Sequence, residues 1–242
     1  MKVGTDGVLL GAWVRLRGTE QHILDIGTGS GVIALMLAQR TEAQPSVTII
    51  GIDIDGASAE EAAANFQASP WAGRMAAFCG DFRGLGADPA HPLRFLAFPY
   101  DLIVSNPPFF RDALRAPDPR RSDARHTDSL RYSDLIAGAV RNLAPDGRLA
   151  LTLPADNADA FTAEAAAAGL SLRRRCRVST LAGHAPVRTL LEFSRTPAAA
   201  SSATPVLTGG LDAPEETTLS IQDSAGFTPA YKALTRDFYL KF

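Results

Sequence analysis

A glycine-rich turn between an apolar run and a helical pattern constrains the fold more than any other feature of the sequence. Residues 22–26 have the pattern of a short strand, residues 27–31 hold three glycines, and residues 32–38 have the apolar spacing of a helix. A strand that leads through glycines into a helix places backbone N–H groups and a helix N-terminus at the carboxyl end of the strand. Open α/β sheets bind ligands at that position, so the pattern predicts an α/β fold with a ligand site at this turn.

Apolar runs and helical patterns continue to alternate after this turn, which is typical of a mostly parallel sheet covered by helices on both faces. Two later apolar runs, at residues 172–180 and 187–193, are separated by Gly183 and Pro186 and predict an antiparallel strand pair. Further strands are expected at residues 47–52, 76–78, 101–105 and 148–153, and further helices up to about residue 66 and at residues 155–168.

The chain has 242 residues, a length that fits one domain. We expect a single domain over residues 1–242, with a core at residues 1–195, a flexible loop at 196–216 and a C-terminal strand and helix at 217–242. The start of that loop has the Ala, Ser, Thr and Pro content of a linker. The segment after the loop is too short to form a separate core.

Composition limits the classes of function. No apolar run reaches the roughly 20 residues of a membrane helix, and no apolar segment follows Met1, so we expect a cytoplasmic protein without membrane contact. The formal net charge of −2 neither favours nor excludes a nucleic-acid partner. Cys79 and Cys176 have no CxxC or histidine neighbours, so we expect no metal site and two buried thiols.

The acidic residues around the glycine turn narrow the choice of ligand. From Asp25 to Gly31 the spacing is D-x-G-x-G-x-G, which differs from the G-x-G-x-x-G of dinucleotide sites. Asp25 would repel a pyrophosphate and suits a ligand that carries an ammonium group. Asp53 follows the next strand at about the spacing at which a carboxylate bonds ribose hydroxyls. The alternative is a turn whose glycines only allow tight packing.

The strand expected at residues 101–105 runs into Asn106-Pro107-Pro108-Phe109. Two prolines cannot continue a sheet, so the strand stops and presents a rigid turn at the carboxyl edge, beside the expected ligand site. An exocyclic amine on an aromatic ring is a weak nucleophile because its lone pair is delocalised. The side-chain carbonyl of Asn106 and the backbone carbonyl of Pro107 are suited to accept both N–H bonds and free that pair. Phe109 is suited to stack on the base, as in enzymes that extrude a nucleotide; the alternative is a simple loop.

Together, the acidic glycine turn and the Asn-Pro-Pro-Phe element resemble those of class I S-adenosylmethionine-dependent amino-methyltransferases. The resemblance implies a Rossmann-like class I methyltransferase fold with a mostly parallel seven-stranded sheet, S-adenosyl-L-methionine as cofactor, and direct methyl transfer to nitrogen. It assigns Asp25 to the cofactor's amino group, Asp53 to its ribose and Asp81 to its adenine. The cofactor-binding residues that it implies are Lys2, Thr5, Asp6, Asp25, Gly27, Gly29, Gly31, Asp53, Ile54, Asp81, Phe82 and Asn106, and the catalytic residues are Asn106, Pro107 and Phe109.

Residues 2–13, 35–40, 65–71, 124–127 and 231–240 extend the resemblance over most of the chain. They are similar to the bacterial tRNA1(Val) (adenine-37-N6)-methyltransferase family. This similarity implies that the acceptor is N6 of adenosine 37, next to the anticodon of a valine tRNA. It places Lys2, Thr5 and Asp6 at the methionine end of the cofactor, with helix capping by Thr5 or Asp6 as the alternative. Family members carry a short β-rich segment before this opening, so we expect impaired activity or stability relative to a chain extended upstream.

Arginines gather in two segments. The insertion at residues 110–131 is a candidate for tracking RNA phosphates, with a solvated charged loop as the alternative. A second cluster, at residues 173–177, falls on an expected edge strand, where charge either contacts tRNA or discourages aggregation between sheets. We expect a monomer with tRNA as its partner. The substrate-RNA residues that this implies are Phe109, Phe110, Arg111, Arg115, Arg120, Arg121, Arg125 and His126.

The preferred function is therefore methylation of adenine N6 in tRNA. Methylation of guanine N2 in rRNA or of a protein glutamine amide is an alternative, and so is a non-catalytic module that binds S-adenosylmethionine or RNA. Substitution of Asn106 separates these classes, because only an enzyme would lose methyl transfer while keeping cofactor affinity.

Overall fold

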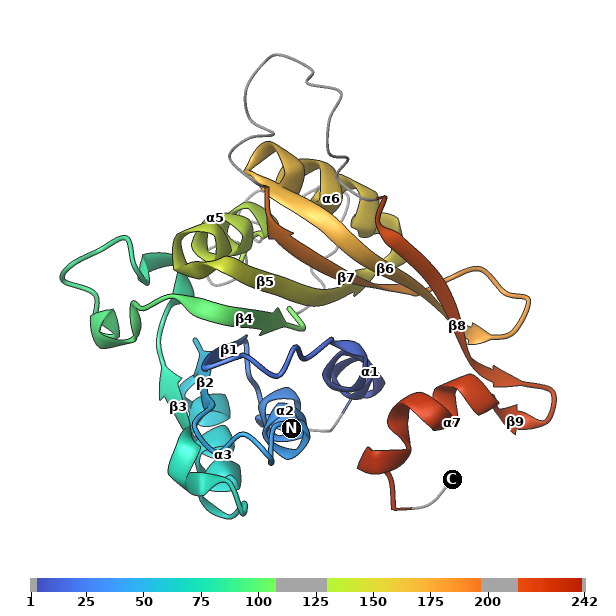
Figure 1. The fold of residues 1–242 in the computed structure, drawn as a ribbon, viewed down its shortest axis with the longest axis horizontal. Helices are drawn as coiled ribbons and strands as arrows, with labels where there is room; N and C mark the ends of the chain where they lie inside the picture. The colour runs from blue at the N-terminus through green and yellow to red at the C-terminus, as the bar shows by residue number, and fades with distance from the viewer. Residues whose placement is uncertain (1–3, 108–129, 197–212, 241–242) are drawn as a thin grey trace, which may run out of the picture.

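A computed structural model of the chain describes residues 4–107, 130–196 and 213–240. This part of the chain holds one sheet of nine strands in the order β3-β2-β1-β4-β5-β7-β6-β8-β9 (Figure 1). The strands are β1 (His22–Ile26), β2 (Thr48–Asp53), β3 (Met75–Cys79), β4 (Tyr100–Ser105), β5 (Leu143–Pro154), β6 (Leu170–Leu181), β7 (Arg188–Arg195), β8 (Glu215–Asp223) and β9 (Gly226–Phe227).

The first five strands form a parallel half-sheet with β1 at its centre. β1 pairs with β2 on one side and with β4 on the other, and β3 and β5 extend the sheet outward. β7 runs antiparallel to both β5 and β6, so the expected antiparallel pair is confirmed. The expected Rossmann-like arrangement is also confirmed, but the described sheet has nine strands rather than seven because β8 and β9 add to it beyond β6.

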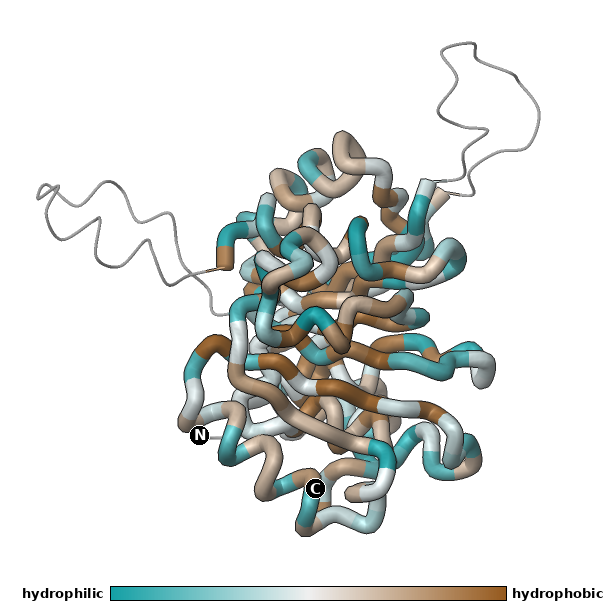
Figure 2. The backbone as a smooth tube through the Cα atoms, turned by 90° about the vertical axis from the view of Figure 1, so that its left-hand side faces the viewer, coloured by the Kyte–Doolittle hydropathy of each residue, from teal (hydrophilic) through white to brown (hydrophobic). Residues whose placement is uncertain are grey.

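The helices of the described chain are α1 (Thr5–Trp13), α2 (Val32–Arg40), α3 (Gly56–Gln67), α5 (Tyr132–Asn142), α6 (Ala158–Ala167) and α7 (Pro229–Thr235). Helices α1, α2 and α3 cover one face of the sheet through buried side chains such as Leu10 and Phe66. Helices α5 and α6 cover the other face through Leu135 and Phe161. Hydrophobic residues concentrate in the strands between these layers, as Figure 2 shows.

Strand β6 is not the edge strand that the sequence predicts. It lies between β7 and β8, and Arg175 and Arg177 contact Glu216 of β8 at 3.7 Å and 2.7 Å. The prediction was wrong because the pairing of β6 with β8 spans a segment of linker composition that carries no strand pattern. Residues 197–212 of that expected loop lie outside the described residues.

The C-terminal segment packs back onto the first helix. The helix expected within residues 217–242 is α7, and a single tight turn (Arg236–Phe238) follows it. Leu234 and Phe238 pack against Val8 of α1 and Met36 of α2. In the described ranges, no helix is both long and apolar enough to span a lipid bilayer.

Of the two cysteines, Cys176 is buried and Cys79 is exposed. Cys79 is the last residue of β3, where the chain leaves the sheet, and its thiol donates to the carbonyl oxygen of Ile54 at 3.7 Å. The prediction of two buried thiols is therefore correct for Cys176 and wrong for Cys79.

Candidate active site

A cavity of about 530 Å³ lies at the carboxyl edge of the parallel half-sheet. Its walls come from the turns that follow β1, β2, β3 and β4, because parallel strands bring their carboxyl ends to the same edge. The volume is within the usual range for small-molecule and cofactor sites. The predicted site residues that line it are Gly27, Gly29, Asp53, Ile54, Asp81, Phe82, Asn106 and Pro107.

The glycine turn shapes the first wall. Gly27 and Gly29 have φ angles of +67° and +56°, which favour glycine, and a side chain at Gly27 would meet only open space. The backbone N–H of Gly29 donates to Asp53 at 2.9 Å, and the N–H of Asp55 donates to the other oxygen of Asp53 at 3.0 Å. The turn therefore holds the Asp53 carboxylate in place at the cavity wall.

Gly31 has a different role from the other two glycines. It does not line the cavity, and it precedes α2 with a φ of +82°. A Cβ atom there would lie 2.4 Å from a ring carbon of Phe66 in α3. The structure therefore places Gly31 in the packing between two helices, as the alternative interpretation of this turn expects.

Asp25 lies beneath the turn and is fully buried. Thr28 Oγ1 donates to Asp25 Oδ2 at 2.8 Å, while Asp25 Oδ1 has no hydrogen-bond partner among the described residues. Burial raises the pKa of this carboxyl to about 7, against the lowering effect of the Thr28 hydroxyl. A nearby cation or hydrogen-bond donor would stabilise the ionised form, so the site has the acceptor that an ammonium-bearing ligand requires, although Asp25 does not itself line the cavity.

Asp81 follows β3 and is held by a neighbour that sequence reasoning missed. The guanidinium of Arg83 bonds both carboxylate oxygens, with an Nη2–Oδ2 distance of 2.6 Å, and lowers the pKa of Asp81. Asp81 thus stays an ionised acceptor at the cavity wall. Phe82 beside it is buried and lines the same wall. The D-x-R spacing within a turn is the only local signal that could have identified Arg83.

Asn106 directly follows β4 and lines the same cavity. Its Oδ1 atom is buried and has no hydrogen-bond partner among the described residues. Ser105 Oγ donates to the carbonyl oxygen of Ile26 at 2.9 Å, which ties the end of β4 to the end of β1. A buried acceptor without a partner costs about 1–3 kcal/mol, so a ligand that donates a hydrogen bond to this atom would be stabilised by it.

Thr5 and Asp6 lie outside the cavity lining, in the first turn of α1. Gly4 precedes the helix, and no side chain of the described residues caps it, so the alternative of capping by Thr5 or Asp6 is wrong. Asp6 Oδ2 instead accepts from Nε of Arg188 at 2.9 Å. Arg188 begins β7, 182 positions from Asp6 in the chain, and no local sequence signal could have identified the pair.

Nine of the predicted site residues lie outside the described residues. These are Lys2, Phe109, Phe110, Arg111, Arg115, Arg120, Arg121, Arg125 and His126. Their assignments remain predictions.

The groups around the cavity fit a nucleoside-like ligand that also carries a positive charge. Asp53 and Asp81 are acceptors at two separate positions of the wall, Phe82 is an apolar surface, and the unpartnered oxygen of Asp25 lies beneath the glycine turn. Asn106 adds an acceptor for a second molecule. The arrangement is suited to hold two ligands whose donors meet at one edge of the sheet.

Comparison with known proteins points to methyl transfer. The family model of the methyltransferase small domain matches residues 7–158. The chain is 42% identical over 241 residues to the tRNA1(Val) (adenine(37)-N6)-methyltransferase of Bacteroides fragilis, covering 100% of this chain and 92% of that protein. It is 41% identical over 249 residues to the enzyme of the same name from Edwardsiella ictaluri, covering 100% and 88%.

The fold is also found in solved methyltransferase structures. A predicted O-methyltransferase from Agrobacterium tumefaciens superposes with a TM-score of 0.64 at 18% identity, over 96% of each chain. The CcbJ methyltransferase from Streptomyces caelestis superposes with a TM-score of 0.55 at 13% identity, over 80% of this chain and 90% of that one. At such identities the likeness concerns the fold alone.

Proposed function

The chain belongs to the tRNA1(Val) (adenine(37)-N6)-methyltransferase family, and we therefore propose that it transfers a methyl group from S-adenosyl-L-methionine to N6 of adenosine 37 in a valine tRNA. The relatives named above match the whole chain, so the substrate in their name is the best-supported acceptor here. The single observation on this chain that carries the proposal is the buried Oδ1 of Asn106 at the cavity wall, which has no hydrogen-bond partner among the described residues.

Asn106 and Pro107 act on the acceptor amine. The side-chain oxygen of Asn106 accepts one N–H of the adenine amine, and the backbone carbonyl of Pro107, which also lines the cavity, accepts the other. Both bonds draw electron density toward the nitrogen and turn its lone pair out of conjugation with the ring. Because these acceptors are fixed at the end of β4, they need no reorganisation when charge develops on nitrogen.

Carboxylates hold the methyl donor. S-adenosyl-L-methionine, when bound, supplies a methyl group on a positively charged sulfur. Asp53 would take the ribose hydroxyls, Asp81 with Phe82 the adenine, and Asp25 the amino group directly or through water. The described residues supply binding and orientation, and the transfer needs no covalent enzyme intermediate.

The decisive variant is Asn106→Ala. We expect its kcat for tRNA methylation to fall by about 100- to 1000-fold, as when one donor or acceptor of a preorganised site is removed. Its Kd for S-adenosylhomocysteine, measured by calorimetry, should stay within about twofold, because Asn106 mainly contacts the acceptor. Asn157→Ala is a matched control, since its side chain contacts Tyr132 Oη at 3.0 Å and does not line the cavity. Unchanged methylation by Asn106→Ala would contradict the proposal.

The acceptor is identified in a separate assay. The protein is incubated with labelled cofactor and either total RNA or total protein, and the methylated product is identified by mass spectrometry. We expect N6-methyladenosine in tRNA. Label in N2-methylguanosine or in methylglutamine would replace the adenine assignment by one of the two alternative acceptors, and no label at all would favour a non-catalytic binding module.

A further inference from the structure

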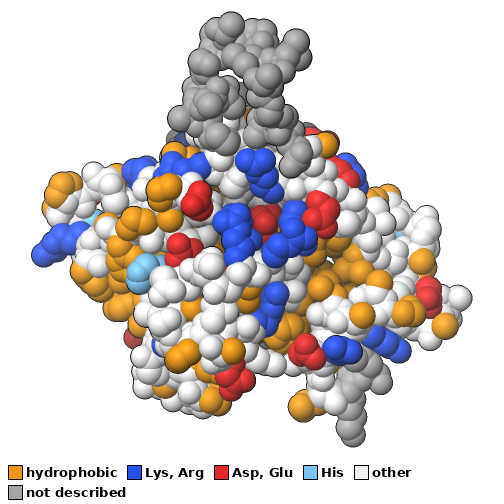
Figure 3. Space-filling model, viewed as in Figure 1, with side chains coloured by type: hydrophobic (Ala, Val, Ile, Leu, Met, Phe, Trp, Pro, Cys, Tyr) orange, Lys and Arg blue, Asp and Glu red, His pale blue; other side chains and the backbone are white. Residues whose placement is uncertain are grey.

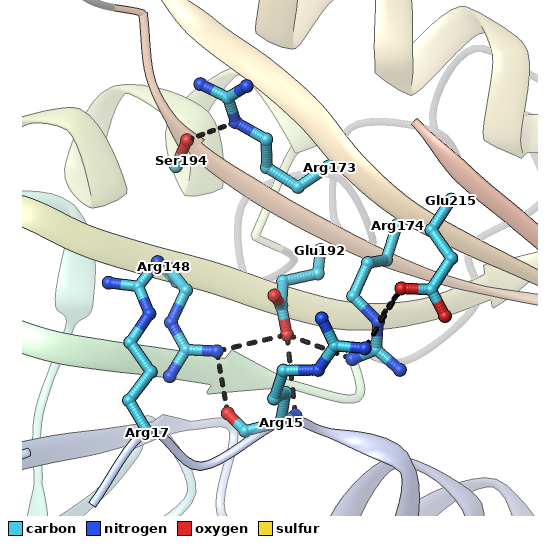
Figure 4. Close-up of a pocket in the computed structure, with 8 residues that line it drawn as sticks. All are labelled: Arg15, Arg17, Arg148, Arg173, Arg174, Glu192, Ser194 and Glu215. Atoms are coloured by element: carbon cyan, nitrogen blue, oxygen red, sulfur yellow. Dashed lines mark hydrogen bonds and ion pairs between the residues drawn. The ribbon is translucent and has the colours of Figure 1, made fainter. Parts of the chain in front are cut away.

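A second cavity, of about 330 Å³, lies on the sheet face that α1 covers. Figure 4 shows its lining, which is dominated by arginines from the segment after α1 and from strands β5 and β6. In the space-filling view the same face carries a group of blue side chains around red ones near its centre (Figure 3). Within the described part of the chain, the cavity shares no lining residue with the candidate active site.

Three of these arginines are neutralised by carboxylates. Arg148 lies 2.6 Å from Glu20 and 3.3 Å from Glu192. Arg174 lies 3.4 Å from Glu192 as well, and both Arg174 and Arg15 contact a further glutamate, Glu215. Three guanidinium groups thus face three carboxylates, of which Glu192 and Glu215 line the cavity, and the charges of these six groups balance.

Two further arginines carry a surplus of positive charge. In the described chain, the side chain of Arg17 donates only to the backbone oxygen of Asp146, at 2.9 Å. The side chain of Arg173 donates only to the hydroxyl of Ser194, at 2.7 Å. Five arginines against three carboxylates leave a net charge of 5 − 3 = +2, and both uncompensated guanidinium groups line the cavity.

Donors without hydrogen-bond partners accompany this surplus charge. Nε of Arg148, whose side chain is 2% exposed, has no hydrogen-bond partner among the described residues. Nε of Arg174 also makes no hydrogen bond within that part of the chain, and approaches Glu215 only at 3.5 Å. Buried polar atoms are normally paired, so unpartnered donors beside a positively charged cavity indicate a ligand rich in acceptors. The planar guanidinium group of arginine, with its paired N–H donors, matches phosphate oxygens in geometry and charge.

A β-bulge brings the two arginines of β6 together. The register of β6 against β7 shifts between Leu172 and Arg174. Successive side chains of a regular strand point to opposite faces, so Arg173 and Arg174 would normally be separated by the sheet. The extra residue lets both line the same cavity. Bulges of this kind redirect side chains and are frequent beside functional sites.

The position of the cavity fits a nucleic acid whose base enters the active site. Arg148 of β5 lies opposite Leu102 of β4, and Asn106, the residue directly after β4, is four positions further along the chain. At about 3.3 Å per residue, Arg148 lies roughly 13 Å from Asn106 along the strand direction. That distance corresponds to about four nucleotides of a stacked strand at about 3.4 Å each.

From these observations we infer that the arginine cavity is a binding site for a backbone phosphate of the RNA substrate, with Arg17 and Arg173 as its principal ligands. The inference rests on the proposed function, because it concerns how the same tRNA is held a few nucleotides from the modified base. Glu192 pairs with Arg148 and Arg174 and holds them in position. Arg17 and Arg173, which pair with no carboxylate in the described chain, supply the charge that binds the phosphate.

The test compares the double variant Arg17→Gln/Arg173→Gln with the control Arg94→Gln/Arg236→Gln. Both variants remove two positive charges, but Arg94 and Arg236 are exposed and lie outside the cavity. We expect the first to weaken tRNA binding about tenfold at 0.1 M salt, and to reduce the slope of log K against log salt concentration by about one. The control should keep the slope of the unmodified protein. Methylation at saturating tRNA should keep its kcat in both variants.

A second arm uses inorganic phosphate alone. Phosphate should raise the Tm of the unmodified protein and of the control, and raise it less in Arg17→Gln/Arg173→Gln. Phosphate stabilisation without any effect on tRNA affinity would overturn the RNA assignment and indicate a free anion as ligand. Equal tRNA binding and equal phosphate effects in both variants would overturn the site altogether. If the unmodified protein methylates no RNA, the proposed function fails, and the phosphate arm still decides whether the cavity binds an anion.

Discussion

The active-site cavity and the arginine cavity lie beside opposite kinds of buried atoms that have no hydrogen-bond partner among the described residues. At the carboxyl edge, Asp25 and Asn106 each leave an oxygen without a donor among the described residues. On the α1 face, Arg148 and Arg174 each leave an Nε–H without a hydrogen-bond acceptor in the same part of the chain. The first cavity is therefore suited to amines and hydroxyls, and the second to phosphate oxygens. The sign of an unsatisfied group thus predicts the chemistry of the ligand that would satisfy it.

The two regions also differ in how they tolerate buried charge. Glu192 faces two guanidinium groups, and Glu20 accepts from the backbone N–H groups of Arg17 and Gly18 at 2.8 Å and 3.0 Å in addition to its contact with Arg148. Asp25 has only one hydroxyl partner in the described chain, and its pKa rises to about 7. The arginine cavity is held together by mutual pairing, whereas the active-site cavity retains an unfavourable group that a ligand would stabilise.

The largest effect on the free energy of unfolding should come from removing Arg148, which pairs with Glu20 and Glu192 beside the arginine cavity. We expect Arg148→Met to lower the free energy of unfolding by up to about 5 kcal/mol, because it leaves Glu20 and Glu192 buried without a main partner. Arg177→Met is the control, since the Arg177–Glu216 pair is about 40% exposed and should contribute less than about 1 kcal/mol. Urea denaturation measures both. If both variants lose the same free energy of unfolding, the buried pairs of Arg148 are no more stabilising than the exposed Arg177–Glu216 pair, and the distinction fails.

The stability of Asp25→Asn, measured as a function of pH, tests whether the buried Asp25 carboxyl near the active-site cavity is unfavourable when ionised. The Asp25 carboxyl has a pKa of about 7 in the folded protein and 3.8 in the unfolded chain. Between these values only the folded state keeps the proton, so stability falls as pH rises from about 4 to 7 and is then level. The amide cannot ionise. The stability of Asp25→Asn relative to the unmodified protein should therefore rise by about 4 kcal/mol across this window.

Urea titrations at about pH 4 and about pH 8 measure this effect, because the two conditions lie at either end of the window. Cofactor affinity should fall in the same variant, since the amide no longer offers an anionic partner to an ammonium group. A stability difference that does not depend on pH would show that Asp25 is ionised throughout and already compensated.

The smallest effect concerns helix α1, which precedes the arginine cavity in the chain. Helix α1 contacts Arg188 through Asp6 in its first turn, and the chain reaches the arginine cavity just after its last turn, at Arg15. A double-mutant cycle of Asp6→Asn and Arg188→Gln should give a coupling energy of about 1 kcal/mol in the free energy of unfolding, measured by urea denaturation, because the pair is only partly buried. The coupling should decrease at about 1 M salt. Zero coupling at low salt would mean that the pair does not position α1.

Features encoded by neighbouring residues could be predicted from the sequence. The glycine turn, the acid that ends β2 and the Asn-Pro-Pro element each lie within a few residues of a strand end, and parallel topology brings such ends to one edge. Gly31 shows the limit of that reasoning. Its spacing matches Gly27 and Gly29, but its closest neighbour is Phe66, which belongs to another helix.

Features that join distant residues could not be predicted. Arg148 and Glu20 are 128 positions apart, and Asp6 and Arg188 are 182 positions apart. The arginines at residues 173–177 appear in sequence as one basic cluster, yet a bulge and the addition of β8 divide them among different partners.

Backbone propensity and turn chemistry act over a few residues, so the α/β class, the order of the elements and the residues at the carboxyl edge were already determined by the amino-acid sequence. The tertiary structure was needed to establish which charges are paired and which remain available. Pairing depends on the register of strands that meet after long connections, and a shift of one residue in that register moves a side chain to the other face.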